Sequence, residues 1–266
     1  MKFLACFIYL ICLFLTIYGQ NEVAVSPPES EKENERKTEV QVTTNYEVLS
    51  KNLGSWKSVT INVRHDFSKR QVLYGFYQKA YRASVSSDTA TVGLYQPLSK
   101  NHTLLLEMSA SPGHQFLPKW SGMAQLETKL SPTTFLNTGY RRTIYRDAKL
   151  NIANIGVEKY WKAYRFTYTA SIAKPENDDV TFSNRIQADK YYGEKNSTIN
   201  ADVTFGNEVA SFFGDGKVLK SNIFSIGVGG KHWFNNRFGV NYRASFHRQG
   251  EFYNRGGTTL GVIYRF

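Results

Sequence analysis

Cysteine is scarce in this chain of 266 residues, since only Cys6 and Cys12 occur and both lie within the first 20 residues. The rest of the chain therefore has neither a disulfide framework nor a thiolate metal site. Long apolar runs are also missing after residue 17. Because a membrane-spanning helix needs about 20 predominantly apolar residues, the sequence excludes a bundle of such helices.

Motifs for catalysis are missing as well. The five histidines lack the spacing of metal ligands, and neither HExxH nor GxSxG occurs. The Gly-rich stretch "GVGGKHW" at residues 227–233 lies in a predicted strand, so it is not the phosphate loop that precedes a helix. We interpret its glycines as relieving crowding inside the fold, and we expect no catalytic residue, no metal and no cofactor.

The N-terminal residues have the layout of an export signal. Lys2 precedes an apolar run from Phe3 to Ile17, which predicts a signal peptide over residues 1–20. A retained transmembrane helix is the weaker interpretation, because this run is shorter than the roughly 20 residues that a span needs. Residues 21–43 are rich in Glu, Lys, Ser and Pro, which predicts a disordered periplasmic linker.

Apolar and polar residues alternate along most of the remaining chain. From Phe238 to Phe246 every second residue is apolar, and the same period of two recurs at 164–172 and 199–205. Most of the predicted strands exceed the roughly five or six residues usual in soluble proteins and match the nine to eleven of a tilted membrane-spanning strand. The predicted strands are 43–50, 55–66, 71–82, 88–98, 102–111, 120–130, 134–145, 149–160, 163–173, 179–191, 197–208, 220–233, 237–248 and 256–266.

These features predict an all-β fold, a transmembrane antiparallel up-and-down β-barrel of about 14 strands in the outer membrane. Short connections alternate with mostly longer ones, so we expect periplasmic termini and long extracellular loops. Tryptophans such as Trp56, Trp120 and Trp233 lie at predicted strand ends, which is typical of aromatic girdles at the two membrane interfaces. Outer-membrane lipid and lipopolysaccharide are the expected surroundings.

The chain ends on an alternating apolar pattern. Leu260, Val262, Tyr264 and Phe266 resemble the C-terminal assembly signal that the barrel-assembly machinery of Gram-negative bacteria recognises. We therefore expect that machinery as a partner during biogenesis.

The opposite parity of each strand points into the predicted lumen. Basic side chains outnumber acidic ones there, which favours anionic solutes. The alternative is that these side chains pair across the lumen and plug it, since eight-stranded barrels are filled, barrels of sixteen or more leave a channel, and fourteen lies between. The lumen-lining candidates are Arg64, Glu107, Glu127, Arg141, Arg165, Arg185, Asp189, Asp202, Lys231 and Arg243, with Gln125, Lys129 and Arg265 at the same parity.

The formal net charge of +11 raises nucleic acid as a partner. Basic residues are spread along the chain without a basic helix or stripe, so we expect no nucleic acid. Head-group phosphates or an acidic solute explain the charge equally well.

Two stretches resemble a known family. "SWKSVTINVRHDF" at residues 55–67 and "LSPTTFLNTGYRRTIYRDAKLNIANIGVEKYWKAYRFTY" at residues 130–168 are similar to the YaiO family of outer-membrane β-barrels, over roughly residues 44–266. The resemblance implies fold and location rather than catalytic residues, together with a suspected link to polysaccharide export.

Two functions are open at this point. The first is a conduit, or an accessory, for passage of polysaccharide or small anionic solutes across the outer membrane. The second is an outer-membrane enzyme or surface-binding barrel with its site in the long extracellular loops, where Ser121 with His114, or the pair Asp178 and Asp179, would be the polar groups at hand.

Overall fold

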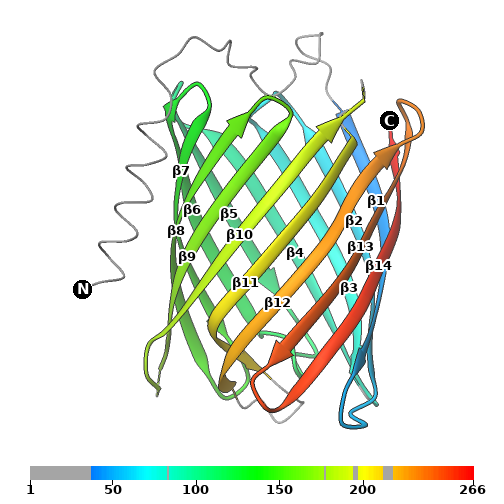
Figure 1. The fold of residues 1–266 in the computed structure, drawn as a ribbon, viewed down its shortest axis with the longest axis vertical. Helices are drawn as coiled ribbons and strands as arrows, with labels where there is room; N and C mark the ends of the chain where they lie inside the picture. The colour runs from blue at the N-terminus through cyan, green and yellow to red at the C-terminus, as the bar shows by residue number, and fades with distance from the viewer. Residues whose placement is uncertain (1–36, 83, 177, 194–196, 212–217) are drawn as a thin grey trace.

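The chain forms one closed antiparallel barrel in the computed structural model, which describes residues 37–82, 84–176, 178–193, 197–211 and 218–266 (Figure 1). Each strand pairs with the next in sequence, and β14 pairs with β1 to close the ring. Among the described residues, no helix has the length and apolar character needed to cross a membrane. The strands are β1 (Lys37–Leu49), β2 (Ser55–Asp66), β3 (Val72–Arg82), β4 (Val85–Pro97), β5 (His102–Ala110), β6 (Trp120–Ser131), β7 (Thr134–Ile144), β8 (Lys149–Trp161), β9 (Tyr164–Pro175), β10 (Thr181–Tyr192), β11 (Ser197–Ser211), β12 (Val218–Trp233), β13 (Phe238–Gln249) and β14 (Tyr253–Arg265).

The predicted fold class and strand order are confirmed, but the start of the barrel is not where the sequence indicated. Strand β1 begins at Lys37, so residues 37–43 belong to the barrel rather than to the predicted linker 21–43. The reason is that Glu39 and Gln41, which made this stretch look solvated, face the inside of the ring beside Arg265 and Ile263 of β14. The predicted signal peptide 1–20 and the rest of the linker lie outside the described residues.

Several connections are shorter than the sequence predicted. Strand β4 begins at Val85 rather than at 88, and β14 begins at Tyr253 rather than at 256, so both strands extend into segments that we expected to be long loops. Tyr253 continues the alternation of its strand and is buried on the inner side. The connection between β5 and β6, residues 111–119, stays long.

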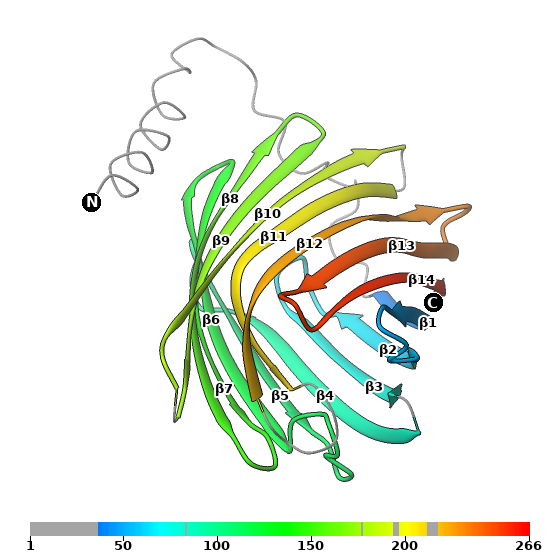
Figure 2. The ribbon, with the colours of Figure 1, turned by 60° about the horizontal axis from the view of Figure 1, so that its bottom comes forward.

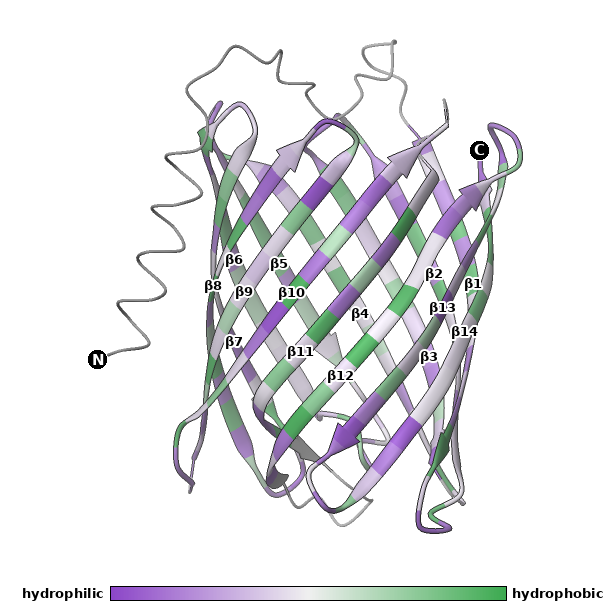
Figure 3. Ribbon diagram, viewed as in Figure 1, coloured by the Kyte–Doolittle hydropathy of each residue, from purple (hydrophilic) through white to green (hydrophobic). Residues whose placement is uncertain are grey.

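The two faces of the wall differ in polarity. Apolar residues such as Met108, Leu260 and Val262 are 66%, 62% and 57% exposed and point outward, while their strand neighbours point inward. Figure 3 shows this alternation as green and purple segments along single strands. A continuous apolar outer surface is costly in water and is what a strand barrel presents to lipid.

Both described chain ends lie at one rim, which we call the terminal rim, at the top of Figure 1. There the backbone amide of Phe266 donates to the carbonyl of Thr38 at 2.9 Å, which extends the closing ladder to the last residue. The Phe266 ring packs edge-on against Tyr264 at 4.7 Å and is 71% exposed. We call the other end the opposite rim; Figure 2 turns it forward and shows the strands as a closed ring.

Candidate functional site

The inner wall of the barrel carries the polar chemistry of the molecule. The strand register places each of the ten lumen-lining candidates on the inner side, opposite inward-facing residues of the neighbouring strands. Glu127, on β6, has no ion pair in the described part of the chain. The other nine form separate groups.

Two aspartates organise the charges of β9 to β13. Asp202 on β11 accepts from Arg243 of β13 and lies 3.4 Å from the Arg185 guanidinium of β10. Asp189 accepts from the Arg165 Nε at 3.1 Å. Gln187 donates to both oxygens of Asp189 at 3.0 and 3.1 Å, so this carboxylate is held against the wall from two sides.

Glycines make room for this arrangement. A Cβ on Gly227 would overlap the Arg243 guanidinium, and one on Gly229 would press on the Arg243 backbone. Because Gly227 and Gly229 place no side chain on the inner face of β12, the Arg243 side chain lies against this strand and reaches Asp202 on β11. Gly227 and Gly229 of the GVGGKHW stretch therefore relieve crowding inside the barrel, whereas Gly230 lies on the outward-facing side beside Tyr242.

A second group lies across β3, β5, β6 and β7. Glu107 accepts from the Tyr74 hydroxyl at 2.6 Å and from the Arg141 guanidinium at 2.8 Å. Arg141 also donates to Ser121 Oγ at 3.0 Å. The Tyr74 ring in turn covers Gly93, where a Cβ would overlap it. Hydrogen bonds among Tyr74, Glu107 and Arg141 therefore connect β3, β5 and β7, each two strands from the next.

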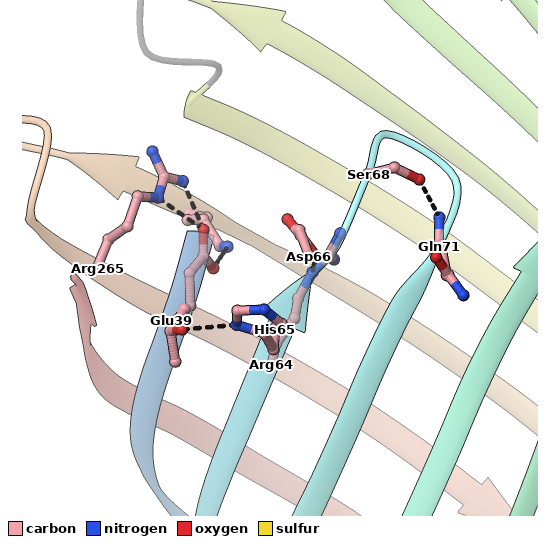
Figure 4. A network of polar contacts seen from close by, with 9 residues as sticks. Glu39, Arg64, His65, Asp66, Ser68, Gln71 and Arg265 are labelled. Atoms are coloured by element: carbon pink, nitrogen blue, oxygen red, sulfur yellow. Dashed lines mark hydrogen bonds and ion pairs between the residues drawn. The ribbon is translucent and has the colours of Figure 1, made fainter. Parts of the chain in front are cut away.

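At the terminal rim, β1 contributes the acceptor that the sequence analysis missed. Glu39 accepts from the Arg265 Nε at 2.9 Å (Figure 4). The Lys231 ammonium lies 3.4 Å from the Glu39 carboxylate. Both cations lie over the Trp233 ring, at 4.0 Å for Arg265 and 5.2 Å for Lys231. Beside them, Arg64 donates to Asp66 at 2.7 Å.

At the opposite rim, an inward-facing tryptophan is again stacked with cations. The Trp56 ring lies 4.0 Å from the Arg82 guanidinium and 4.8 Å from that of Arg255. Arg82 also lies 4.6 Å from the ring of Phe116, which is 3% exposed and belongs to the β5–β6 connection. The backbone amide of Gln115 donates to Ser87 Oγ at 3.0 Å. The β5–β6 connection is therefore fastened to the inner side of the wall.

Burial continues into the neighbouring β7–β8 connection at this rim. Tyr145 lies there, and burial raises the pKa of its hydroxyl above its usual range.

The ion pairs run along the wall instead of across the lumen. Adjacent strands are joined by Asp189–Arg165, Asp202–Arg185, Glu158–Arg165, Glu39–Arg265 and Glu47–Arg255. Strands two or three apart are joined by Glu107–Arg141, Asp202–Arg243 and Glu39–Lys231, and Arg64–Asp66 lies within β2. In these pairs with arginine and lysine the carboxylate is the less exposed partner: the side chains of Asp189 and Asp202 are 5% exposed and that of Glu107 is 15%. The inward-facing Glu208 differs, since its side chain is 43% exposed beside His247.

The cationic partners reach farther from the wall. The side chains of Arg64 and Arg185 are each 50% exposed although both point inward. These two guanidinium groups are therefore accessible from the lumen.

The inner wall is nonetheless closer to neutral than the sequence predicted. The described inward-facing basic residues are Lys37, Arg64, Arg82, Lys129, Arg141, Arg165, Arg185, Lys231, Arg243, Arg255 and Arg265; the acidic ones are Glu39, Glu47, Asp66, Glu107, Glu127, Glu158, Asp189, Asp202 and Glu208. Basic groups exceed acidic groups by two. Glu39 was missed because it lay in the presumed linker, and Glu47 and Glu158 were missed although the parity of their strands was readable.

The loop groups considered for catalysis contact other residues, and the Asp178 side chain accepts from the Asp179 backbone amide at 2.7 Å. Ser121 lies on β6, where it accepts from Arg141, while His114 in the β5–β6 connection lies 3.0 Å from the carbonyl of Pro112. Asp179 faces Lys220 at 3.8 Å. In the described ranges no three His, Cys, Asp or Glu side chains gather into a set that could hold a metal ion.

The closed fourteen-stranded ring, its apolar outer wall and its charged inner wall define an outer-membrane β-barrel. A family model described as the YaiO membrane beta barrel domain matches residues 37–209. The chain belongs to the YaiO family. A comparison with curated proteins gives no match.

Solved structures share the fold at low sequence identity. A "Bacterial polysaccharide outer membrane secretin" matches with a TM-score of 0.54 at 9% identity, over 89% of this chain and 100% of that one. The "CymD monoaromatic hydrocarbon channel" matches with 0.55 at 9%, over 89% of both chains. The outer membrane protein Omp33 of Acinetobacter baumannii matches with 0.50 at 11%, over 86% of this chain and 99% of that one. These likenesses show the barrel fold alone.

Proposed function

We propose that this barrel is a conduit across the outer membrane for anionic solutes, with acidic polysaccharide as one candidate class. The observation that carries the proposal is the unequal exposure of the inner-wall charges. Asp189 and Asp202 lie 5% exposed beneath basic side chains, whereas Arg185 is 50% exposed. A solute in the lumen would meet cationic groups whose counter-charges lie behind them, and such a surface attracts anions.

The direction of the barrel is part of the proposal. An even number of strands puts both termini at one rim, and in barrels of this class that rim faces the periplasm. The opposite rim, with the long β5–β6 connection, would then face the outside. One protein of similar fold is named a polysaccharide secretin, which agrees with the polymer class but assigns nothing to this chain.

Conductance of the purified protein in a planar bilayer tests the proposal. We expect steady openings whose reversal potential in a salt gradient indicates anion preference. A barrel that inserts but never conducts would refute the conduit and favour the alternative, a surface-binding or enzymatic barrel with its site in the connections of the opposite rim.

A further inference from the structure

The strands of the outer wall carry basic residues almost without acidic ones. Asp88 is the one outward-facing acid in the described strands, as the register shows. Just beyond the strand ends, Glu176 pairs with Lys149 at 2.8 Å and Asp179 lies 3.8 Å from Lys220. Lys159 and Lys190 lie near the terminal rim, and the other outward-facing basic residues lie toward the opposite rim. These others are Lys57, Lys79, Arg142, Lys149, Lys174, Lys220 and Arg248.

Three of these outward positions form one row across β7, β8 and β9. Arg142 pairs in register with Asn151, and Asn151 pairs with Lys174. Since neighbouring strands lie about 4.8 Å apart, the backbones of Arg142 and Lys174 are about 10 Å apart. On the β6 side the register partner of Arg142 is Gly122, which brings no side chain to the row.

The row presents hydrogen-bond donors. The Tyr140 hydroxyl donates to Asn151 Oδ1 at 2.7 Å, so the amide of Asn151 keeps its two N–H donors. Lys174 uses one donor on the carbonyl of Asp178 at 2.7 Å and keeps two. Arg142 is exposed and has no carboxylate partner in the described part of the chain. Guanidinium, amide and ammonium groups together are the donor set that phosphate prefers.

We infer that Arg142, Asn151 and Lys174 form a binding site on the outer wall for the phosphorylated sugar headgroup of a glycolipid in the outer leaflet. Each residue lies within a few positions of the end of its strand at the opposite rim, and apolar residues such as Ile155 and Ile172 continue the same outer face toward the middle of the barrel. A lipid fits this arrangement, because its phosphate would contact the polar row at the rim while its acyl chains contact the apolar residues toward the middle of the barrel. The inference rests on the proposed direction of the barrel, because phosphorylated glycolipid is expected on the outer side alone.

Binding in detergent tests the site without needing a pore or a direction, so its failure is distinguishable from failure of the conduit. The purified full chain would be titrated with bisphosphorylated lipid A and with dephosphorylated lipid A, and bound lipid counted by native mass spectrometry. We expect at least about tenfold weaker binding of the dephosphorylated lipid. The double variant Arg142→Gln with Lys174→Gln is expected to lose that preference, and Arg142→Lys is expected to keep most of it.

The matched control is Lys159→Gln with Lys190→Gln, which removes two outward-facing charges near the terminal rim. Each variant must show the shifted migration of unheated, folded barrel in detergent gels. Equal binding of the two lipids by the wild-type chain, or equal loss in both double variants, would overturn the inference. Full competition by inorganic phosphate at the same phosphate concentration would also overturn it, because the site would then bind free anion and not a lipid headgroup.

Discussion

Reversing one charge on the inner wall should change which ions pass. Arg185 shares Asp202 with Arg243, and its side chain is half-exposed although it points inward. In Arg185→Glu, Arg243 still pairs with Asp202, so the wall keeps its main contact there. We expect the open channel to shift from anion toward cation preference.

The size of the shift follows from Coulomb's law. The substitution changes the wall by two charge units, and at roughly 6 Å in water this alters the energy of a passing ion by about 1.4 kcal/mol. Screening over a Debye length of about 10 Å at 0.1 M salt reduces this to about 0.8 kcal/mol. Anions become about fourfold scarcer beside the position, and cations become more abundant by a similar factor.

The assay is the reversal potential of single open channels in a potassium chloride gradient whose dilute side is about 0.1 M, chosen for that screening length. Lys190→Glu is the control, since Lys190 lies on the same strand but faces outward. We expect the control to match the wild-type chain and Arg185→Lys to do the same. Open channels of Arg185→Glu with an unchanged reversal potential would show that Arg185 does not face the conducting path.

Three further predictions concern assembly and the wall. Phe266→Asp should lower the amount of folded barrel in outer-membrane fractions far more than Lys231→Ala, because it places a charge on the lipid face at the last closing residue; equal amounts would contradict this. Gly227→Ala should push the Arg243 guanidinium off Asp202 and cost about 1–3 kcal/mol of unfolding free energy by overpacking, measured by denaturant titration in detergent; an unchanged midpoint would count against the packing described. Arg82→Ala should release the β5–β6 connection, losing cation–π contacts of about 0.5–2 kcal/mol each, and is expected to speed protease cleavage within residues 111–119 of intact barrels; an unchanged cleavage rate would refute the fastening.

Much of the fold was readable because a barrel wall separates two unlike solvents. Alternation with a period of two fixes which residues face each way, so the inward parity of Arg185 and Asp202 follows from the sequence alone. The start of β1 was not readable, because a strand whose inward residues are charged has the composition of a solvated linker. Glu39 is the example: its charge is offset by Arg265 and Lys231, which no local pattern reveals.

The sequence does not show which charged residues form ion pairs, because the pairs depend on closure of the barrel. The Glu39 contacts span 192 residues to Lys231 and 226 to Arg265, since they exist only after the ring has closed. The path of Arg243 across Gly227 to Asp202 depends on the register of three strands. Parity gives the face of each residue, whereas register and side-chain reach decide which residues meet.

The net charge of +11 takes on a different meaning once the faces are separated. In the described strands, the inner wall holds an excess of two basic groups, while the outer wall holds nine basic residues against Asp88. Most of the excess therefore faces the membrane, toward the opposite rim, and net charge is no argument for an anion-selective lumen. The proposed anion preference instead follows from exposure, since Asp189 and Asp202 are covered while Arg64 and Arg185 are not. The basic residues thus support two separate proposals. Those on the outer wall support binding of a headgroup phosphate, and those on the inner wall support passage of an anionic solute.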